Sequence, residues 1–129
     1  MYFALNGKDF NPKAITKMLQ IEPTQQGRRG EKGRYIPEQK HSYWQIATEK
    51  GKEYLDIPML VQEIVVQLSS KVEIINSIKE KYQLDSILQI VLDIDVDENI
   101  STPILNFDND VIESLYQTKT EMDIDIYRK

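Results

Sequence analysis

The chain has 129 residues, of which 40% are hydrophobic and 29% are charged, and its formal net charge is −5. This length and composition predict one folded domain over residues 1–129 and exclude a disordered chain, while the acidic balance argues against general nucleic-acid binding. The absence of cysteine excludes disulfides, thiolate metal sites and cysteine nucleophiles and favours the cytoplasm, and apolar stretches that are short and interrupted by charge predict no membrane span.

The first part of the chain predicts a strand, a capped helix, a long loop and a second strand. YFALNG, residues 2–7, has strand composition and ends on a glycine. Asn11 is a good N-cap, Pro12 suits the first helical position, and an apolar face at helical spacing follows. Residues 24–41 show no periodicity and contain three glycines, so we predict a long loop there, followed by a strand in SYWQIAT.

The second part predicts a helical pair and then a strand, a helix and a strand. A helix begins after Asp56, breaks near Ser69, and is followed by a second helix in VEIINSIKEKYQ. SILQIVLDIDV reads as a strand, FDNDVIESLYQT as a capped helix, and EMDIDIY as a final strand. The order β-α-β, helical pair, β-α-β favours an α+β fold. We predict a ferredoxin-like (split βαβ), mainly antiparallel sheet of four or five strands, with helices on one face and the helical pair between the two βαβ units.

The acidic stretch DIDVDEN, residues 93–99, invites comparison with a calcium loop. Counted from Asp93, an EF-hand loop requires Gly at position 6 and Glu at position 12, where this chain has Glu98 and Ile104. Apolar residues instead alternate with polar ones, which predicts strands with one buried face. The buried set is Leu88, Ile90, Leu92, Ile94, Val96, Met122, Ile124 and Ile126, and the opposite set is Asp93, Asp95, Asp97, Asp123, Asp125 and Tyr127. The second set is either an ordinary solvated face or an acidic interaction face for a basic partner or a weakly held hydrated cation.

The segment 25–41 is basic and contains the single histidine, whereas residues 85–125 hold eleven acidic residues and one lysine. Its candidate ligand-binding residues are Arg28, Arg29, Lys32, Arg34 and His41. Neither of the phosphate-binding patterns GxxxxGK[ST] and GxGxxG is present. The segment is therefore either a solvated loop or an anion site made of arginine side chains and of backbone N–H groups that the glycines leave accessible.

No pattern in the sequence supports catalysis, and we predict no catalytic residue, no cofactor and no metal site. His41 lacks a recognisable Ser or Asp partner, and acidic pairs are too common to indicate acid–base chemistry. Trp44 is expected in the core. Tyr2, Tyr43 and Tyr127 are expected on the open sheet face, with a structural role or as a platform for a stacked ligand.

Several stretches in a fixed order resemble a domain-of-unknown-function family, number 4279, over essentially the whole chain. These stretches are YFALNGKDFNPKAIT, IEPT, a glycine-containing loop, YWQI and DIDIY. The resembling positions are Phe3, Leu5, Gly7, Phe10, Pro12, Ile15, Thr16, Pro23, Thr24, Gly27, Trp44 and 123–127. The resemblance implies a shared fold and a bacterial or phage origin, and it brings no activity and no catalytic residue.

The function expected first is therefore a non-enzymatic protein-interaction or binding module with a protein partner. One alternative is a small-ligand or nucleotide-phosphate binder that uses the basic loop 25–41. Another is an immunity-like or anti-defence inhibitor that uses the acidic sheet face. Homodimerisation through the open sheet face is a further hypothesis.

Overall fold

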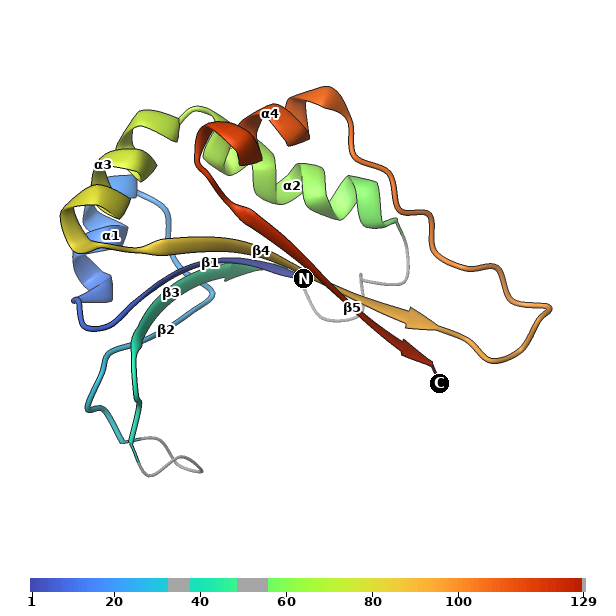
Figure 1. Cartoon of the computed structure of the whole chain (residues 1–129), viewed down its shortest axis with the longest axis horizontal. Helices are drawn as coiled ribbons and strands as arrows, with labels where there is room; N and C mark the ends of the chain where they lie inside the picture. Colours follow the sequence, from blue (N-terminus) through green and yellow to red (C-terminus); the bar gives the residue numbers. More distant parts are fainter. Residues whose placement is uncertain (33–37, 49–55, 129) are drawn as a thin grey trace.

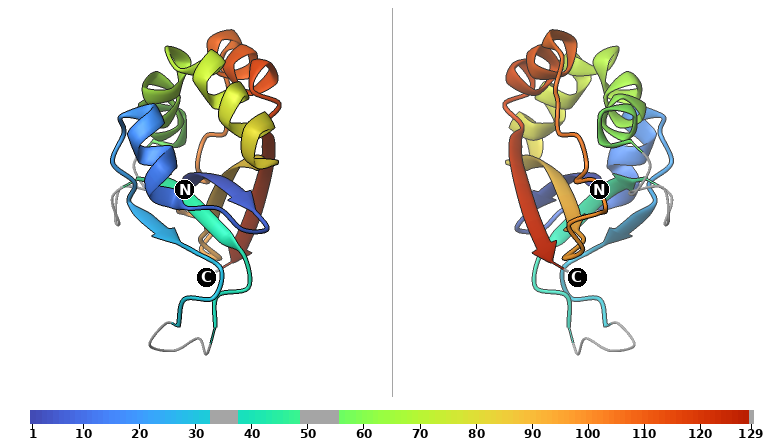
Figure 2. Two further views of the ribbon diagram at one scale, coloured as in Figure 1. Left: turned by 90° about the vertical axis from the view of Figure 1, so that its left-hand side faces the viewer. Right: turned by 90° about the vertical axis from the view of Figure 1, so that its right-hand side faces the viewer.

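The computed structural model describes residues 1–32, 38–48 and 56–128. In chain order the elements are β1 (Tyr2–Gly7), α1 (Pro12–Leu19), β2 (Gln25–Gly27), β3 (Ser42–Ala47), α2 (Ile57–Ser69), α3 (Val72–Tyr82), β4 (Asp85–Ile94), α4 (Asn109–Gln117) and β5 (Glu121–Arg128). The strands form one sheet in the order β2-β3-β1-β4-β5. Figures 1 and 2 show the helices on one side of this sheet, and the other side is open. The predicted α+β class with helices on one face is confirmed.

The sheet is mainly antiparallel. β1 lies between β3 and β4 and is antiparallel to both, and β2 is antiparallel to β3. β1 and β2 therefore run in the same direction with β3 between them, which is the split βαβ arrangement and is compatible with the predicted ferredoxin-like fold. β5 adds to β4 in parallel, through the crossover helix α4, and ends the sheet.

Three helices begin where the sequence predicts an N-cap. The side chains of Asn11, Asp56 and Asp108 accept hydrogen bonds from backbone N–H groups two or three residues later, at 3.1, 3.2 and 3.0 Å. Each bond satisfies one of the N–H groups that a helix leaves without an internal partner. The helices that begin at these caps direct apolar residues toward the sheet.

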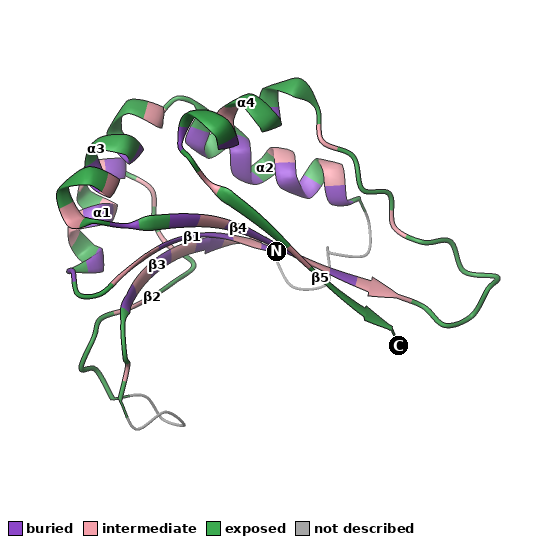
Figure 3. Cartoon of the chain, in the orientation of Figure 1, coloured by how far each residue is buried: buried purple, intermediate pink, exposed green. Residues whose placement is uncertain are grey.

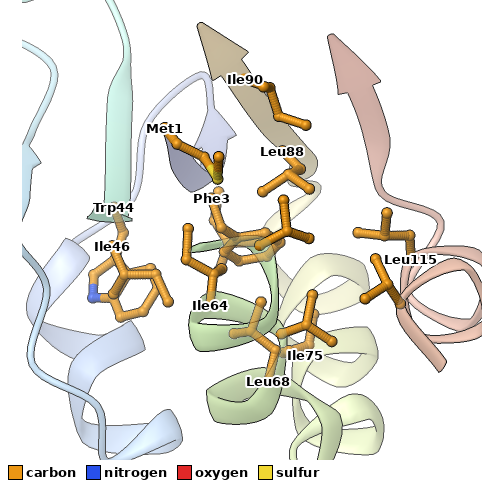
Figure 4. Packing of buried hydrophobic residues seen from close by; sticks show 14 of the residues in the cluster. Met1, Phe3, Trp44, Ile46, Ile64, Leu68, Ile75, Leu88, Ile90 and Leu115 are labelled. Carbon is orange, nitrogen blue, oxygen red and sulfur yellow. The ribbon is translucent and has the colours of Figure 1, made fainter. Parts of the chain in front are cut away.

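The core lies between the helices and the sheet, as Figure 4 shows. Side chains completely or almost completely buried there include Phe3, Leu5, Trp44, Ile46, Ile64, Ile75, Leu88 and Ile90. Each large apolar side chain buried in this way stabilises the fold by about 1.5–3 kcal/mol. The indole N–H of Trp44 donates to the Thr16 hydroxyl at 3.0 Å, which satisfies the polar atom of the predicted core tryptophan.

The predicted long loop 24–41 is wrong in part, because it contains β2. Beyond β2 the hairpin continues, since the Gly30 N–H donates to the Gln39 carbonyl at 2.9 Å and the Gln39 N–H donates to the Glu31 carbonyl at 2.7 Å. β2 has three residues, two of them exposed glutamines at a sheet edge, so it carries no apolar alternation by which it could be recognised. The candidate residue Arg34 lies outside the described residues.

The predicted acidic strand ends earlier than expected. β4 stops at Ile94, so Asp95 and Asp97 do not lie on the strand with Asp93. The Asp95 carboxylate accepts the Asp97 N–H at 2.8 Å, and the Asp97 carboxylate accepts the Asn99 N–H at 3.0 Å. Aspartate readily bonds the backbone two residues further on, and here that local bonding takes the place of strand pairing.

The predicted buried set is confirmed for Leu88, Ile90 and Leu92 and wrong for the end of β4 and for most of β5. Ile94 and Ile124 are partly buried, whereas Met122, Ile126 and Val96, which follows the end of β4, are 37%, 59% and 69% exposed. β5 is the last strand of the sheet, and in Figure 3 most of it is coloured as exposed. The apolar residues of an edge strand are covered from fewer directions than those of a central strand, so alternation alone overestimates their burial.

Candidate functional site

The open face is the side of the sheet opposite the helices, and its side chains are identified by strand alternation. Phe3, Leu5, Trp44 and Leu88 point toward the helices, so their neighbours along each strand point to the open face. The open face consists of Tyr2, Ala4, Asn6, Gln25, Gly27, Tyr43, Gln45, Ala47, Asp85, Ile87, Gln89, Val91, Asp93, Glu121, Asp123, Asp125 and Tyr127. It divides into a neutral half on β1, β2 and β3 and an acidic half on β4 and β5.

The neutral half contains an open pocket of about 360 Å³. Its lining residues are Tyr2, Ala4, Asn6, Gln25, Gln39, His41, Tyr43 and Gln45. Among the described residues, the lining therefore combines aromatic rings with amide groups and includes no carboxylate. Such a surface can stack against a planar group and hydrogen-bond to it, and it presents no acid that would repel an anionic ligand.

Gly27 allows the ring of Tyr43 to approach the backbone of β2 closely. A Cβ atom at Gly27 would be 2.5 Å from Cε1 of Tyr43, which is shorter than any real carbon contact. The ring of His41 lies beside that of Tyr43, with centroids 6.3 Å apart and planes tilted by 50°. The structure thus brings His41, a residue from the predicted ligand loop, together with Tyr43 from the adjoining strand.

The described arginine and lysine residues of the predicted ligand loop lie on the β2–β3 hairpin, and the same hairpin contributes Gln25, Gln39 and Tyr43 to the pocket. Arg28, Arg29, Lys32 and Lys40 are exposed. The Arg28 guanidinium is 3.7 Å from the Asp9 carboxylate, and an exposed pair of this kind contributes at most about 1 kcal/mol. Arg28 and Arg29 therefore remain available to an anion that reaches the hairpin.

The base of the hairpin is held by one buried hydroxyl. The Ser42 hydroxyl oxygen accepts the Phe10 N–H at 3.1 Å and the Arg29 N–H at 3.0 Å. Because Ser42 is completely buried, these bonds connect β3, the start of the hairpin and the turn before α1 in one polar contact. The sequence carried no signal for this role.

The acidic half gathers carboxylates from β4 and β5. In the parallel register Gln89 lies opposite Asp123, Val91 opposite Asp125, and Asp93 opposite Tyr127. The Gln89 amide donates to the Asp125 carboxylate at 2.9 Å, and the Gln89 side chain is largely buried. Asp123, Asp125 and Tyr127 are exposed, and Asp93 is partly buried rather than open as predicted.

Lys79 forms a polar cluster on the helix side that sequence reasoning missed. Its ammonium donates to the Ser86 hydroxyl at 2.8 Å, to the Thr118 carbonyl at 2.6 Å and to the Lys119 carbonyl at 3.2 Å. Burial lowers the pKa of Lys79, against the opposing effect of the Asp85 carboxylate. The cluster joins α3 to the end of α4 and the start of β4, and its geometry fits a structural role.

The described part of the chain offers no metal centre and no membrane-spanning helix. Within it, no three histidine, aspartate or glutamate side chains are grouped as metal ligands would be. None of the helices in residues 1–32, 38–48 and 56–128 combines the length and the apolar character that crossing a membrane requires.

Comparison with known proteins gives one match. The model of the family described as "Domain of unknown function (DUF4279)" matches residues 1–129, the whole chain. No curated protein and no solved structure matches it. The resemblance seen in the sequence is therefore confirmed.

Proposed function

The chain belongs to the DUF4279 family, and because that description carries no activity, we propose its function from its surfaces: it is a non-enzymatic protein-binding module whose acidic half binds a basic protein. One observation carries the proposal. Asp123 and Asp125 are exposed on β5, and Asp93 lies beside them on β4, on a side of the sheet that none of the described helices covers.

Electrostatics explain why a basic partner fits. Carboxylates held on one face repel one another, and a cationic surface removes that repulsion when it binds. Opposite charge also steers the two proteins together, which raises the association rate at low salt and makes it fall as salt screens the charges. The narrower hypothesis of an immunity-like or anti-defence inhibitor uses the same surface and shares this physics.

The test compares two triple variants with the same change in charge. In the first, Asp93, Asp123 and Asp125 become Asn, which keeps an oxygen acceptor for the Gln89 amide. In the second, three exposed glutamates on the helices become Gln: Glu63, Glu73 and Glu80. Partners are captured with the wild-type chain, and association rates are then measured for each purified partner over a range of salt concentrations.

We expect the Asp triple variant to associate at least about tenfold more slowly at low salt, with a weaker salt dependence. The Glu triple variant should behave like the wild type, because its charges lie on the helix side. If both variants associate at the wild-type rate, the acidic half is not the binding surface and the proposal is wrong.

A second candidate function is favoured by the pocket together with the exposed arginines of the same hairpin. A nucleotide could place its planar base against Tyr43 and the amides of the pocket, with its phosphates near Arg28 and Arg29 on the hairpin. Arginine and free backbone amides are the usual protein groups for phosphate.

Thermal unfolding with added nucleotides tests this candidate. We expect stabilisation that requires both the base and the phosphates, and that is lost when Arg28 and Arg29 become Gln. Equal stabilisation by inorganic phosphate would indicate an anion effect without a base site. An unchanged melting temperature with every nucleotide would exclude the candidate.

A further inference from the structure

We propose that β5 accepts an extended basic segment of the partner protein as an additional strand of the sheet. The inference rests on the proposed function, because it names the kind of partner segment that the acidic half recognises and the way in which that segment binds.

β5 is a long open edge. Its eight residues, Glu121–Arg128, pair with β4 on one side, and the sheet order leaves no strand on its other side within the described residues. Alternate peptide groups of such a strand point outward with their hydrogen-bonding groups unpaired. The opposite edge, β2, has only three residues, so β5 is the edge with room for a peptide.

The two sides of β5 differ chemically. Met122 and Ile126 lie on the helix side and are 37% and 59% exposed, whereas Asp123 and Asp125 lie on the open face. A strand added at this edge would therefore meet apolar side chains on one side of the sheet and carboxylates on the other. A segment in which lysine or arginine alternates with an apolar residue would satisfy both sides at once.

A second copy of the chain fits this edge poorly. In an antiparallel pair centred on Ile124, Asp123 of one copy would lie directly opposite Asp125 of the other, twice. Like charges directly opposite one another destabilise a strand pair, so the acids of β5 discourage self-association and select a basic strand.

The experiment uses a synthetic peptide of seven residues in which lysine and valine alternate, with blocked ends, and the full wild-type chain. Two analogues carry N-methyl groups, one on every lysine and the other on every valine. In an added strand only one of these alternate sets of N–H groups points toward β5. Dissociation constants and the hydrogen exchange of the β5 amides are measured for each peptide.

We expect the parent peptide to protect alternate amides in residues 121–128 from exchange. The analogue whose N-methyl groups replace the N–H groups that face β5 should bind at least about tenfold more weakly, because it loses the hydrogen bonds to that strand. The other analogue keeps those N–H groups and should bind almost like the parent. Changing Asp123 and Asp125 to Asn should weaken binding, and the matched control that changes Glu63 and Glu80 to Gln should not.

Other results would overturn the inference in distinguishable ways. If both analogues bind like the parent and no β5 amide is protected, charge alone holds the peptide, and the proposed function survives without strand addition. If the Asp variant binds the peptide as tightly as the wild type, the acidic half is not used and both proposals fail. If no peptide binds, or if the free chain is a dimer with protected β5 amides, the edge does not accept a basic strand.

Discussion

Leu92 and Ile126 form a matched pair that tests both the sheet register and the exposure of β5. They are Cα partners on neighbouring strands and lie on the same side of the sheet. Leu92 is 5% exposed and Ile126 is 59% exposed. The same truncation to alanine at the two positions should therefore have different effects on the free energy of unfolding.

The expected difference follows from burial. Leu92→Ala removes a buried side chain and leaves a cavity, which costs about 2–5 kcal/mol. Ile126 has 41% of its surface covered (100% − 59%), and that share of the about 1.5–3 kcal/mol for a fully buried side chain is about 1 kcal/mol. Truncation there opens space to solvent rather than a cavity, so Ile126→Ala should cost about 1 kcal/mol or less.

Urea unfolding followed by circular dichroism measures both values, and an unchanged m-value confirms that the midpoint shift reports stability. Asp95→Ala is a third comparison, since it removes one exposed hydrogen bond in the turn after β4 and should cost less than Leu92→Ala. If Ile126→Ala costs as much as Leu92→Ala, the edge of β5 is covered. A larger loss from Asp95→Ala would contradict the register.

Three further predictions concern single contacts. Burial lowers the pKa of Lys79 from its ordinary 10.5, so the unfolded chain binds this proton more tightly than the folded chain does. The free energy of unfolding should therefore rise with pH between the lowered pKa and 10.5. Denaturant titrations over that pH range measure the rise, and Lys79→Met should lack it. Thr16→Val leaves the buried indole N–H of Trp44 without its acceptor and should cost about 1–3 kcal/mol in urea unfolding, whereas Thr16→Ser should cost much less. Gly27→Ala places a carbon 2.5 Å from the Tyr43 ring and should displace it, which NMR would detect as shifted Tyr43 resonances; unshifted resonances would contradict the packing of that ring.

Much of the fold could be predicted from the sequence because the relevant signals are local. The N-caps at Asn11, Asp56 and Asp108 and the spacing of the apolar residues located three of the helices. The strands that lie beside β1 in the sheet were recognisable because their buried side faces a continuous core. Both signals depend on the residues of one element and on the presence of a core, and not on how strands are ordered.

The remaining features depend on contacts between distant segments. β2 is defined by its pairing with β3, and Gln25 and Gln26 give no apolar alternation. The carbonyls that Lys79 contacts lie 39 and 40 residues later in the chain, so no spacing rule predicts them. The candidate site shows the same limit, since the grouping of His41 with Tyr43 near Gln25 requires the sheet to be assembled.

The central position of β1 has a consequence for the order of folding. β1 pairs with β3 and β4, whose residues follow it by about 40 and 85 positions, so the first strand cannot find its partners until much of the chain is available. The β2–β3 hairpin and the β4-α4-β5 unit join segments much closer in sequence than β1 and β4 are, so their loops cost less entropy to close than the loop between β1 and β4. We therefore expect the β2–β3 hairpin and the β4-α4-β5 unit to form first and β1 to pair between them later. The pairing of β1 with strands distant in sequence should then limit the folding rate.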